Sequence, residues 1–508
     1  METQTIYYSN AYCGAGKTTW AVDHMARTPG RFIYAVDRTD EFSVRQNLII
    51  SNAIEAGGSV RVTTLSRKAG DVVSQDFPLV IERYSHEDHV VVIITHEAMK
   101  IVDHSVVEGL GWSIIVDEDP KIWCSASFDL GASSPFWLAN YTLEPFAVGY
   151  STIHAKADAP SWRALMADDL TRPMAAFHNR IKRAGAVVNL ERWEELERRQ
   201  RLTYYALWDV TELAVYDPAV ILANSFDSLV TFRLIRSVHP KVNLQPMDIG
   251  SNHVWKRRGL TINYMAEDHV AGSTFFETTE AGRRAVDEWS AWVRKNVSEK
   301  DHYWAANKKR GDLKLPGKQV SPKIAGSNEY RDMTQCSVLY SAKANGSEEA
   351  VFAAMTNGLI DRDAVRRDRE FEDLIQIVFR SSLRMHDDTR PVTVTVYDKE
   401  QATFLKAYFD AAGFPFCTTL NFIDLGLTRQ KQTPGRKPDP LKPPKTAAQR
   451  AADYRARKWQ RDVAGRDQLD AGGRAQRRSV EAGHAGIVHR DAGRTDRGDF
   501  LPNGRDGG

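Results

Sequence analysis

Ala11-Tyr12-Cys13-Gly14-Ala15-Gly16-Lys17-Thr18-Thr19 is the stretch of sequence on which the interpretation of the fold depends. The apolar run 5–8 before it is typical of a β-strand, and residues 18–25 after it follow the spacing of an α-helix. Glycines let the backbone turn closely around a ligand with several N–H groups facing inward, and the helix that follows adds the positive end of its dipole. The order of strand, loop and helix therefore predicts a cradle for the phosphates of a nucleotide.

The residues of this loop have separate predicted tasks. Lys17 is expected to reach the β- and γ-phosphates of ATP, and the Thr18 hydroxyl is expected to hold Mg²⁺. A glycine-rich turn with a solvated lysine is the alternative interpretation. The candidate nucleotide-binding residues are Cys13, Gly14, Ala15, Gly16, Lys17, Thr18 and Thr19.

A second group of polar residues ends the apolar run 112–116, which is typical of a buried strand. The chain continues as Asp117-Glu118-Asp119-Pro120. At the carboxyl edge of a parallel sheet, Asp117 would lie beside the phosphate loop, where ligands of such sheets bind. We expect Asp117 to hold Mg²⁺ through water, and Glu118 to orient and deprotonate the attacking water. An acidic turn that caps a helix is the alternative interpretation.

Gln376, Arg380 and Arg384 form a third group, spaced by four residues within the largely apolar segment 373–384. On one helix these side chains would share a face. Guanidinium groups brought to a γ-phosphate stabilise the charge that develops during phosphoryl transfer. We therefore predict a catalytic role for this row, with Arg380 as the stronger candidate. A basic or salt-bridged surface helix is the alternative interpretation.

Together the three groups resemble motifs I, II and VI of superfamily 2 helicases of the DEAD/DEAH-like kind. The loop has the form AxxGxGKT, in which Ala11 stands at the first glycine of GxxxxGK[ST], and Asp-Glu-Asp-Pro stands where the family has its DEAD or DExH box. In the pattern QxxGRxxR, Phe379 replaces the glycine and Arg384 falls one position late. The resemblance covers about residues 5–425. It implies an ATP hydrolase with two RecA-like lobes, ATP and Mg²⁺ as cofactors, and movement on nucleic acid, with DNA favoured over RNA.

The order of apolar runs predicts an α/β protein with two parallel sheets of the P-loop NTPase kind. Strands are expected at 5–8, 32–36, 60–63, 90–95, 113–116, 219–223, 260–264, 303–306, 336–340 and 392–397, and helices at 279–296 and 399–411. We predict a first lobe at 1–250 with a helical insertion at about 155–215, and a second lobe at 251–427. The charged stretch 192–201 is expected to be an exposed helix.

Four further loops resemble weaker motifs of the same superfamily. They are 32–40 at the place of motif Ia, Thr95-His96-Glu97 as a nucleic acid contact, 223–227 at motif III, and 326–332 near motif V. Motif III couples the sites for ATP and nucleic acid in this superfamily. Each of the four loops also fits an ordinary turn after a strand.

Composition separates an ordinary globular body from a basic tail. The 508 residues include 42% hydrophobic and 26% charged side chains, with no apolar run long enough to span a membrane and no signal peptide, so a cytoplasmic protein is expected. The four cysteines lack the spacing of a zinc site and fit reduced thiols. Residues 428–508 carry 19 Lys and Arg against 10 Asp and Glu, which predicts a mostly disordered tail. One helix is expected at 446–461, where basic side chains alternate with Tyr454 and Trp459, a pattern suited to nucleic acid.

Two alternatives to a nucleic acid motor stay open. A phage DNA-packaging-type ATPase would share the phosphate loop and the acidic pair, but it also needs the clustered carboxylates of a nuclease, and Asp361, Asp363, Asp387 and Asp388 lie among arginines. A non-motor nucleotide switch or nucleic-acid-binding scaffold would need only weak ATP hydrolysis. The compact length and the unusual motifs suggest a replication protein of a phage or mobile element.

Overall fold

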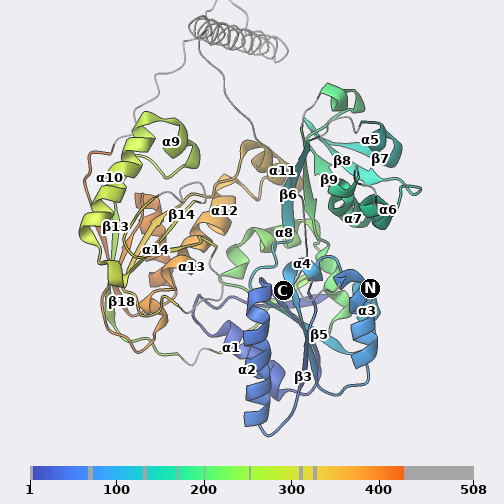
Figure 1. Ribbon diagram of the computed structural model, residues 1–508, viewed down its shortest axis with the longest axis horizontal. Helices are drawn as coiled ribbons and strands as arrows, with labels where there is room; N and C mark the ends of the chain where they lie inside the picture. Colours follow the sequence, from blue (N-terminus) through green and yellow to red (C-terminus); the bar gives the residue numbers. More distant parts are fainter. Residues whose placement is uncertain are drawn as a thin grey trace, which may run out of the picture. The chain divides into compact units, whose positions relative to one another are not determined.

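Three sheets organise the part of the chain that the computed structural model describes (Figure 1). The described residues are 4–66, 72–129, 134–167, 169, 171–198, 201–250, 253–307, 313–323 and 329–427. The predicted tail at 428–508, its helix at 446–461, and residues 326–328 of the motif V loop lie outside them. Within the described helices, none has the length and hydrophobicity needed to cross a membrane.

The first sheet forms lobe 1 and has seven parallel strands in the order β12-β1-β11-β5-β2-β4-β3. Every strand predicted here is confirmed to within one residue at either end, whereas β12 was not predicted. The strands are β1 (Thr5–Ser9), β2 (Arg31–Val36), β3 (Arg61–Thr64), β4 (Val90–Thr95), β5 (Trp112–Asp117), β11 (Ala219–Leu222) and β12 (Asn243–Pro246).

Helices cover both faces of this sheet, which explains why strands such as β4 are apolar without alternation. Met25 of α1 and Ile49 of α2 are buried against one face, and Phe77 of α3 and Leu234 of α8 against the other. The helices are α1 (Lys17–Arg27), α2 (Phe42–Glu55), α3 (Val73–Tyr84), α4 (His96–Met99) and α8 (Val230–Val238).

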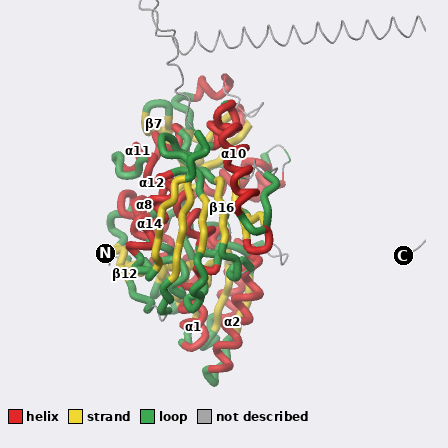
Figure 2. Tube along the Cα trace, turned by 90° about the vertical axis from the view of Figure 1, so that its left-hand side faces the viewer, coloured by secondary structure: helices red, strands yellow, loops and turns green. Residues whose placement is uncertain are grey.

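The second sheet forms lobe 2 and has six parallel strands in the order β15-β14-β16-β17-β13-β18. Figure 2 shows α10 and α14 on opposite sides of it, where Trp289 and Leu405 are buried in separate cores. The strands are β13 (Arg258–Tyr264), β14 (His302–Ala306), β15 (Lys318–Val320), β16 (Gln335–Leu339), β17 (Val392–Thr395) and β18 (Phe416–Phe422). The helices are α9 (Ser273–Thr278), α10 (Glu280–Asn296), α13 (Glu372–Val378) and α14 (Lys399–Ala411).

The predictions for lobe 2 are confirmed closely. The helix α14 has the predicted bounds, and α10 begins one residue late because the Thr279 side chain caps its N-terminus by accepting a bond from the Gly282 N–H. The predicted boundary at residue 250 falls between β12 and β13. That boundary stays a prediction.

An insertion between β5 and β11 carries the third sheet, which is antiparallel in the order β6-β10-β9-β8-β7. Its strands are β6 (Trp123–Asp129), β7 (Tyr141–Ala147), β8 (Tyr150–Ala155), β9 (Ala186–Val188) and β10 (Arg201–Leu207). Its helices are α5 (Ser134–Asn140), α6 (Trp162–Ala167) and α7 (Ala175–Ala184). Trp137, Phe177 and Tyr204 join these elements in one core.

The prediction of a purely helical insertion needs correction. The helices α6 and α7 lie within the predicted range, but they pack on an antiparallel sheet. Its pairing of β6 with β10 joins residues more than 70 positions apart, which no local pattern reveals. The expected helix at 192–201 is a 3₁₀ helix at Trp193–Arg198, and β10 begins at Arg201. Leu196 is the buried residue of that 3₁₀ helix, so little apolar surface is available to hold a longer one.

The segment with α11 (Gly346–Thr356) and α12 (Arg362–Arg366) follows β16 of lobe 2 but packs elsewhere. Phe352 and Val365 belong to the core of lobe 1, and Val351 is buried with Tyr205 of the insertion sheet. Figure 1 shows α11 beside β6. This segment therefore ties lobe 2 both to lobe 1 and to the insertion.

Candidate nucleotide-binding site

The predicted phosphate loop joins β1 to α1 and turns through two glycines in the left-handed region. The φ angles are 82° at Gly14 and 90° at Gly16, and such values are readily adopted only by glycine. Ala11 has no positive φ, so its position does not require the glycine of the commoner signature. The helix α1 begins at Lys17 and directs its N-terminus at the loop.

Lys17 lies across the loop. Its ammonium donates to the carbonyl oxygens of Ala11 at 2.8 Å and Tyr12 at 2.9 Å. Burial lowers the pKa of Lys17, and neighbouring acidic groups, Glu372 and Asp117 among them, oppose this effect. The ammonium is therefore held at the centre of the loop by groups that a phosphate could replace.

Asp117 and Thr18, the two predicted metal-binding residues, are brought into contact. The Thr18 hydroxyl lies 2.9 Å and 3.1 Å from the two carboxylate oxygens of Asp117. Asp117 is buried at the end of β5, where it also accepts a 2.6 Å hydrogen bond from the Tyr34 hydroxyl. A carboxylate beside a hydroxyl is the oxygen donor set that Mg²⁺ prefers. Among the described residues no three His, Cys, Asp or Glu side chains gather as a metal cluster, so phosphate or water oxygens would have to complete the coordination.

Glu118 follows Asp117 with an unusual backbone. Its φ is 78°, and its N–H donates to the Leu222 carbonyl at 3.0 Å, so β11 holds this conformation. Left-handed backbone at a residue other than glycine is a strain that occurs often at functional sites. Burial and the charge of Asp117 raise the pKa of Glu118 to about 8, while Arg380 acts in the opposite direction.

The row Gln376, Arg380 and Arg384 does not lie on one helix, contrary to the prediction. The helix α13 ends at Val378, Arg380 lies in the turn that follows, and Arg384 ends a 3₁₀ turn at Ser382–Arg384. Tertiary packing nevertheless turns all three toward lobe 1. The Gln376 side-chain oxygen accepts from the Cys13 thiol at 3.6 Å and from Arg380 at 3.5 Å. Burial and the neighbouring Arg380 lower the pKa of Arg384 to about 10, and Glu118 partly opposes this.

Phe379, which stands where motif VI has glycine, packs on the phosphate loop. A Cβ atom at Gly14 would lie 2.9 Å from its ring and 3.4 Å from the Trp255 ring. The Tyr12 ring is in contact with Trp255 at 5.8 Å and Phe414 at 4.7 Å between centroids. The absence of a side chain at Gly14 thus leaves the space that the Phe379 ring occupies.

A chain of hydrogen bonds that the sequence did not predict also connects the two lobes. The Cys13 N–H donates to the Tyr408 hydroxyl at 2.8 Å, and that hydroxyl donates to the Asn224 side chain at 2.9 Å. Asn224 then donates to Glu372 at 2.7 Å, and Gln376 donates to the other Glu372 oxygen at 3.1 Å. Burial raises the pKa of Glu372 to about 7, and the bonds from Asn224 and Gln376 oppose this rise.

Among the weaker motif loops, 223–227 contributes Asn224 to this chain of bonds. His96 is buried at the start of α4, and Thr95 caps that helix. Burial lowers the pKa of His96, with partial opposition from Asp37. Nothing in the sequence around Tyr408 or Glu372 marked either residue as functional, because each occupies an ordinary position of a helix.

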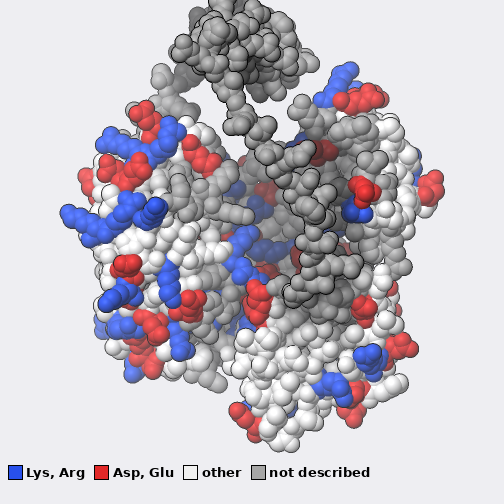
Figure 3. All heavy atoms as spheres, viewed as in Figure 1, with Lys and Arg blue, Asp and Glu red and all other residues white. Residues whose placement is uncertain are grey.

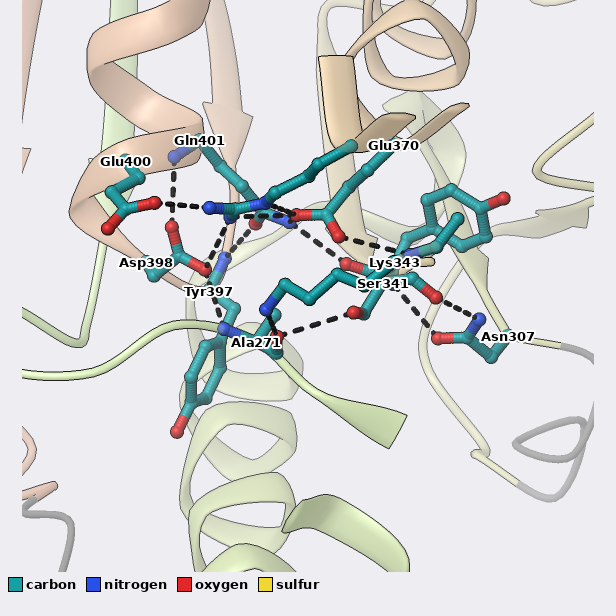
Figure 4. Close-up of polar contacts among 12 residues, drawn as sticks. Ala271, Asn307, Ser341, Lys343, Glu370, Tyr397, Asp398, Glu400 and Gln401 are labelled. Atoms are coloured by element: carbon teal, nitrogen blue, oxygen red, sulfur yellow. Dashed lines mark hydrogen bonds and ion pairs between the residues drawn. The ribbon is translucent and has the colours of Figure 1, made fainter. Parts of the chain in front are cut away.

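A second candidate site is a cavity of ≈ 400 Å³ at the carboxyl ends of β13 and β16. Its lining includes Ser273, Thr274, Ser341, Lys343, Asn345 and Arg362. Figure 4 shows the buried polar network beside it. Asp398 accepts from the Ala271 N–H at 2.7 Å, and the Gln401 amide donates to Glu370 at 3.0 Å. These partners hold the cavity wall in one arrangement.

No protein-family model matches this chain, and no curated protein matches it. Solved structures do match. A structure named XPD_APO is 11% identical and matches 83% of this chain and 97% of its own, with a TM-score of 0.48. The structure of S. tokodaii Xpd4 is 11% identical and matches 83% of this chain and 96% of its own, with a TM-score of 0.43.

S. cerevisiae Dbp5 bound to RNA and ADP BeF3 is 10% identical, with coverage of 83% and 85% and a TM-score of 0.34. At identities of 10–11% these matches concern the fold alone. The predicted α/β fold class with two parallel sheets is confirmed by the strand pairing of the structure itself, while the roles of individual residues stay predictions.

Proposed function

We propose that this protein is an ATP-dependent helicase or translocase that couples ATP hydrolysis between two RecA-like lobes to movement on nucleic acid. The observation that carries the proposal is one shared site. Lys17, Thr18, Asp117 and Glu118 from lobe 1 lie with Gln376, Arg380 and Arg384 from lobe 2, and hydrogen bonds such as that from Cys13 to Gln376 connect the two sets.

Each side chain then has a task in hydrolysis. Lys17 exchanges its two loop carbonyls for the β- and γ-phosphates of ATP. Thr18 and Asp117 would hold Mg²⁺, whose charge would offset that of the phosphates. Glu118, the residue after Asp117, would accept a proton from the attacking water.

Arg380 stabilises the charge that develops on the γ-phosphate. Because Arg380 belongs to lobe 2 and the phosphate loop to lobe 1, the arginine contact depends on how closely the lobes approach. Hydrolysis transfers the γ-phosphoryl group to water, and release of the phosphate then removes the anion that both lobes bind, so the lobes separate. Repeated closure and opening would move nucleic acid along the protein.

Nucleic acid contact is proposed for the cavity at β13 and β16. Lys343 and Arg362 offer positive charge there, and Ser273, Thr274 and Asn345 offer hydrogen bonds, the combination that phosphate backbones require. On the face seen in Figure 3, Lys and Arg are interspersed with Asp and Glu rather than gathered in one broad patch. The related Dbp5 structure is one bound to RNA, and DNA is our preferred polymer for this chain.

The packaging-type ATPase is the less supported alternative. A nuclease of that kind needs several carboxylates around its metals, and the described residues contain no such cluster. A non-motor nucleotide switch remains a distinct second candidate, because a nucleotide site between two lobes serves a switch as well as a motor.

The test is ATP hydrolysis measured alone and with single-stranded DNA, duplex DNA or RNA, followed by strand displacement on the polymer that stimulates it. We expect Lys17→Ala to abolish hydrolysis, while the control Lys406→Ala, which removes an exposed lysine paired with Asp410, keeps it. Near wild-type turnover in Lys17→Ala would refute the site. Hydrolysis that no polymer stimulates would favour the switch.

A further inference from the structure

The chain that leaves the candidate catalytic carboxylates is held by lobe 2 before it enters the insertion. Lys121, three residues after Glu118, has a φ of 47°. Its ammonium lies 3.6 Å from Asp368 and 3.7 Å from Asp119. Asp368 is buried and also accepts from the Val230 N–H at 3.0 Å. The loop between β5 and β6 is therefore tied to a carboxylate of lobe 2.

Trp123, the first residue of β6, makes a second tie. Its indole N–H donates to Glu348 of α11 at 3.2 Å, and its ring lies 4.2 Å from the Phe352 ring between centroids. Glu348 is only 3% exposed, and Arg369 binds both of its oxygens, one of them at 3.0 Å. A buried carboxylate depends strongly on each partner, so the Trp123, Glu348 and Arg369 side chains form one unit.

Both ties end on the same turn of lobe 2. Asp368 and Arg369 lie in a π-helical turn, Arg367–Phe371, which runs directly into α13. Such turns occur frequently at functional sites. The next residue is Glu372, which belongs to the hydrogen-bond chain of the nucleotide site. A displacement of β6 that carries Glu348 or Lys121 with it therefore acts on the start of α13.

We propose that Lys121, Trp123, Glu348, Asp368 and Arg369 form a clasp that couples the insertion sheet to the arginine row of the nucleotide site. The clasp residues are positioning residues, since the hydrogen bonds and ion pairs that define the clasp join them to one another rather than to the phosphate loop. The proposal rests on the proposed function: nucleic acid at the cavity lined by Asn345, the N-cap of α11, displaces Glu348 and stimulates hydrolysis through the clasp. By reciprocity, nucleotide binding alters the insertion sheet through the same contacts.

Two conservative variants test the clasp. Trp123→Phe keeps an aromatic ring but removes the N–H that Glu348 accepts, and Arg369→Lys keeps the charge but removes the paired geometry. Trp304→Phe is the matched control, because the indole N–H of Trp304 is buried without a hydrogen-bond partner among the described residues. Thermal unfolding of each variant verifies that the fold is kept.

We expect both clasp variants to hydrolyse ATP at the basal rate and to lose about fivefold or more of the stimulation by single-stranded DNA. The double variant should lose no more than either single one, because both act through Glu348. Full stimulation in Trp123→Phe, or additive losses in the double variant, would overturn the proposal.

A second readout separates this proposal from the proposed function. Hydrogen exchange of β6 and β10 is measured with and without a non-hydrolysable ATP analogue, in the absence of nucleic acid. We expect the analogue to change exchange in the wild type and Trp304→Phe but not in Trp123→Phe. The same response in Trp123→Phe, or none in the wild type, would overturn the clasp. A wild type without polymer stimulation would instead refute the motor.

Discussion

Arg380 is the single side chain on which the proposed chemistry depends most in lobe 2. It is 4% exposed, contacts Gln376, and lowers the pKa of Glu118 in lobe 1 against the effect of burial. The shift of the helix end to Val378 does not remove it from the site, because the turn after α13 brings it back toward lobe 1. The spacing of four residues identified Gln376, Arg380 and Arg384 as a group, but it did not predict the backbone conformation that positions them.

Arg380→Ala is expected to lower kcat by about 10³-fold or more while the nucleotide still binds, because the arginine acts on charge that develops in the transition state. Single-turnover hydrolysis and nucleotide titration measure the two effects separately. Arg390→Ala, which removes an exposed arginine paired with Asp388, is the control. An unchanged kcat would show that Arg380 has a structural role and no catalytic one.

Glu372 makes a pH-dependent contribution to stability. Burial raises its pKa from 4.5 to about 7 in the folded protein, so between these values the folded state binds more protons than the unfolded state. The free energy of unfolding therefore falls as pH rises through this window, by at most about 3 kcal/mol, and is constant with respect to this group above it.

Glu372→Gln should remove that contribution. We expect the variant to gain stability relative to the wild type as pH rises from 5 to 8, measured by urea unfolding at each pH. The exposed Glu299→Gln is the control. A stability difference between Glu372→Gln and the wild type that does not vary with pH would contradict the assignment.

At the scale of elements, the turn between β1 and α1 is constrained both by its own backbone and by lobe 2. Gly14 and Gly57 have nearly the same φ, 82° and 78°, but a Cβ atom would meet Phe379 at 2.9 Å in the first case and nothing within 4 Å in the second. Substitutions at the two glycines therefore distinguish the effect of backbone strain from the effect of the Phe379 contact.

Gly57→Ala is expected to cost about 1–2 kcal/mol through strain alone. Gly14→Ala should cost more and weaken nucleotide binding, because the Phe379 ring and the phosphate loop must move apart. Chemical denaturation and nucleotide titration of both variants provide the comparison. Equal losses of stability, with nucleotide affinity intact, would show that the Phe379 contact is unimportant.

At the scale of the whole molecule, the basic segment beyond residue 427 belongs to the proposed nucleic acid interaction. Removing 428–508 is expected to weaken nucleic acid binding, and to reduce the slope of log K against log salt by about 0.9 for each phosphate of duplex DNA that the segment neutralises. Salt titrations of the truncated and full chains measure this. ATP hydrolysis without polymer should be unchanged in the truncated chain. Identical salt slopes for the two chains would show that the tail does not contribute to nucleic acid binding.

The sequence by itself determined the α/β class and most strands of both parallel sheets, because periodicity is a local property of a chain. Short motifs, which are local too, predicted the groups Lys17, Asp117-Glu118 and Gln376 with Arg380. Only the tertiary structure decided the sheet of the insertion, the docking of α11 and the bonds from Cys13 through Tyr408 and Asn224 to Glu372. Those features join residues far apart in the chain, and a side chain with one distant partner leaves no pattern in its own neighbourhood. The physical reason is that burial and hydrogen-bond geometry depend on which surfaces meet, whereas propensity depends on nearest neighbours.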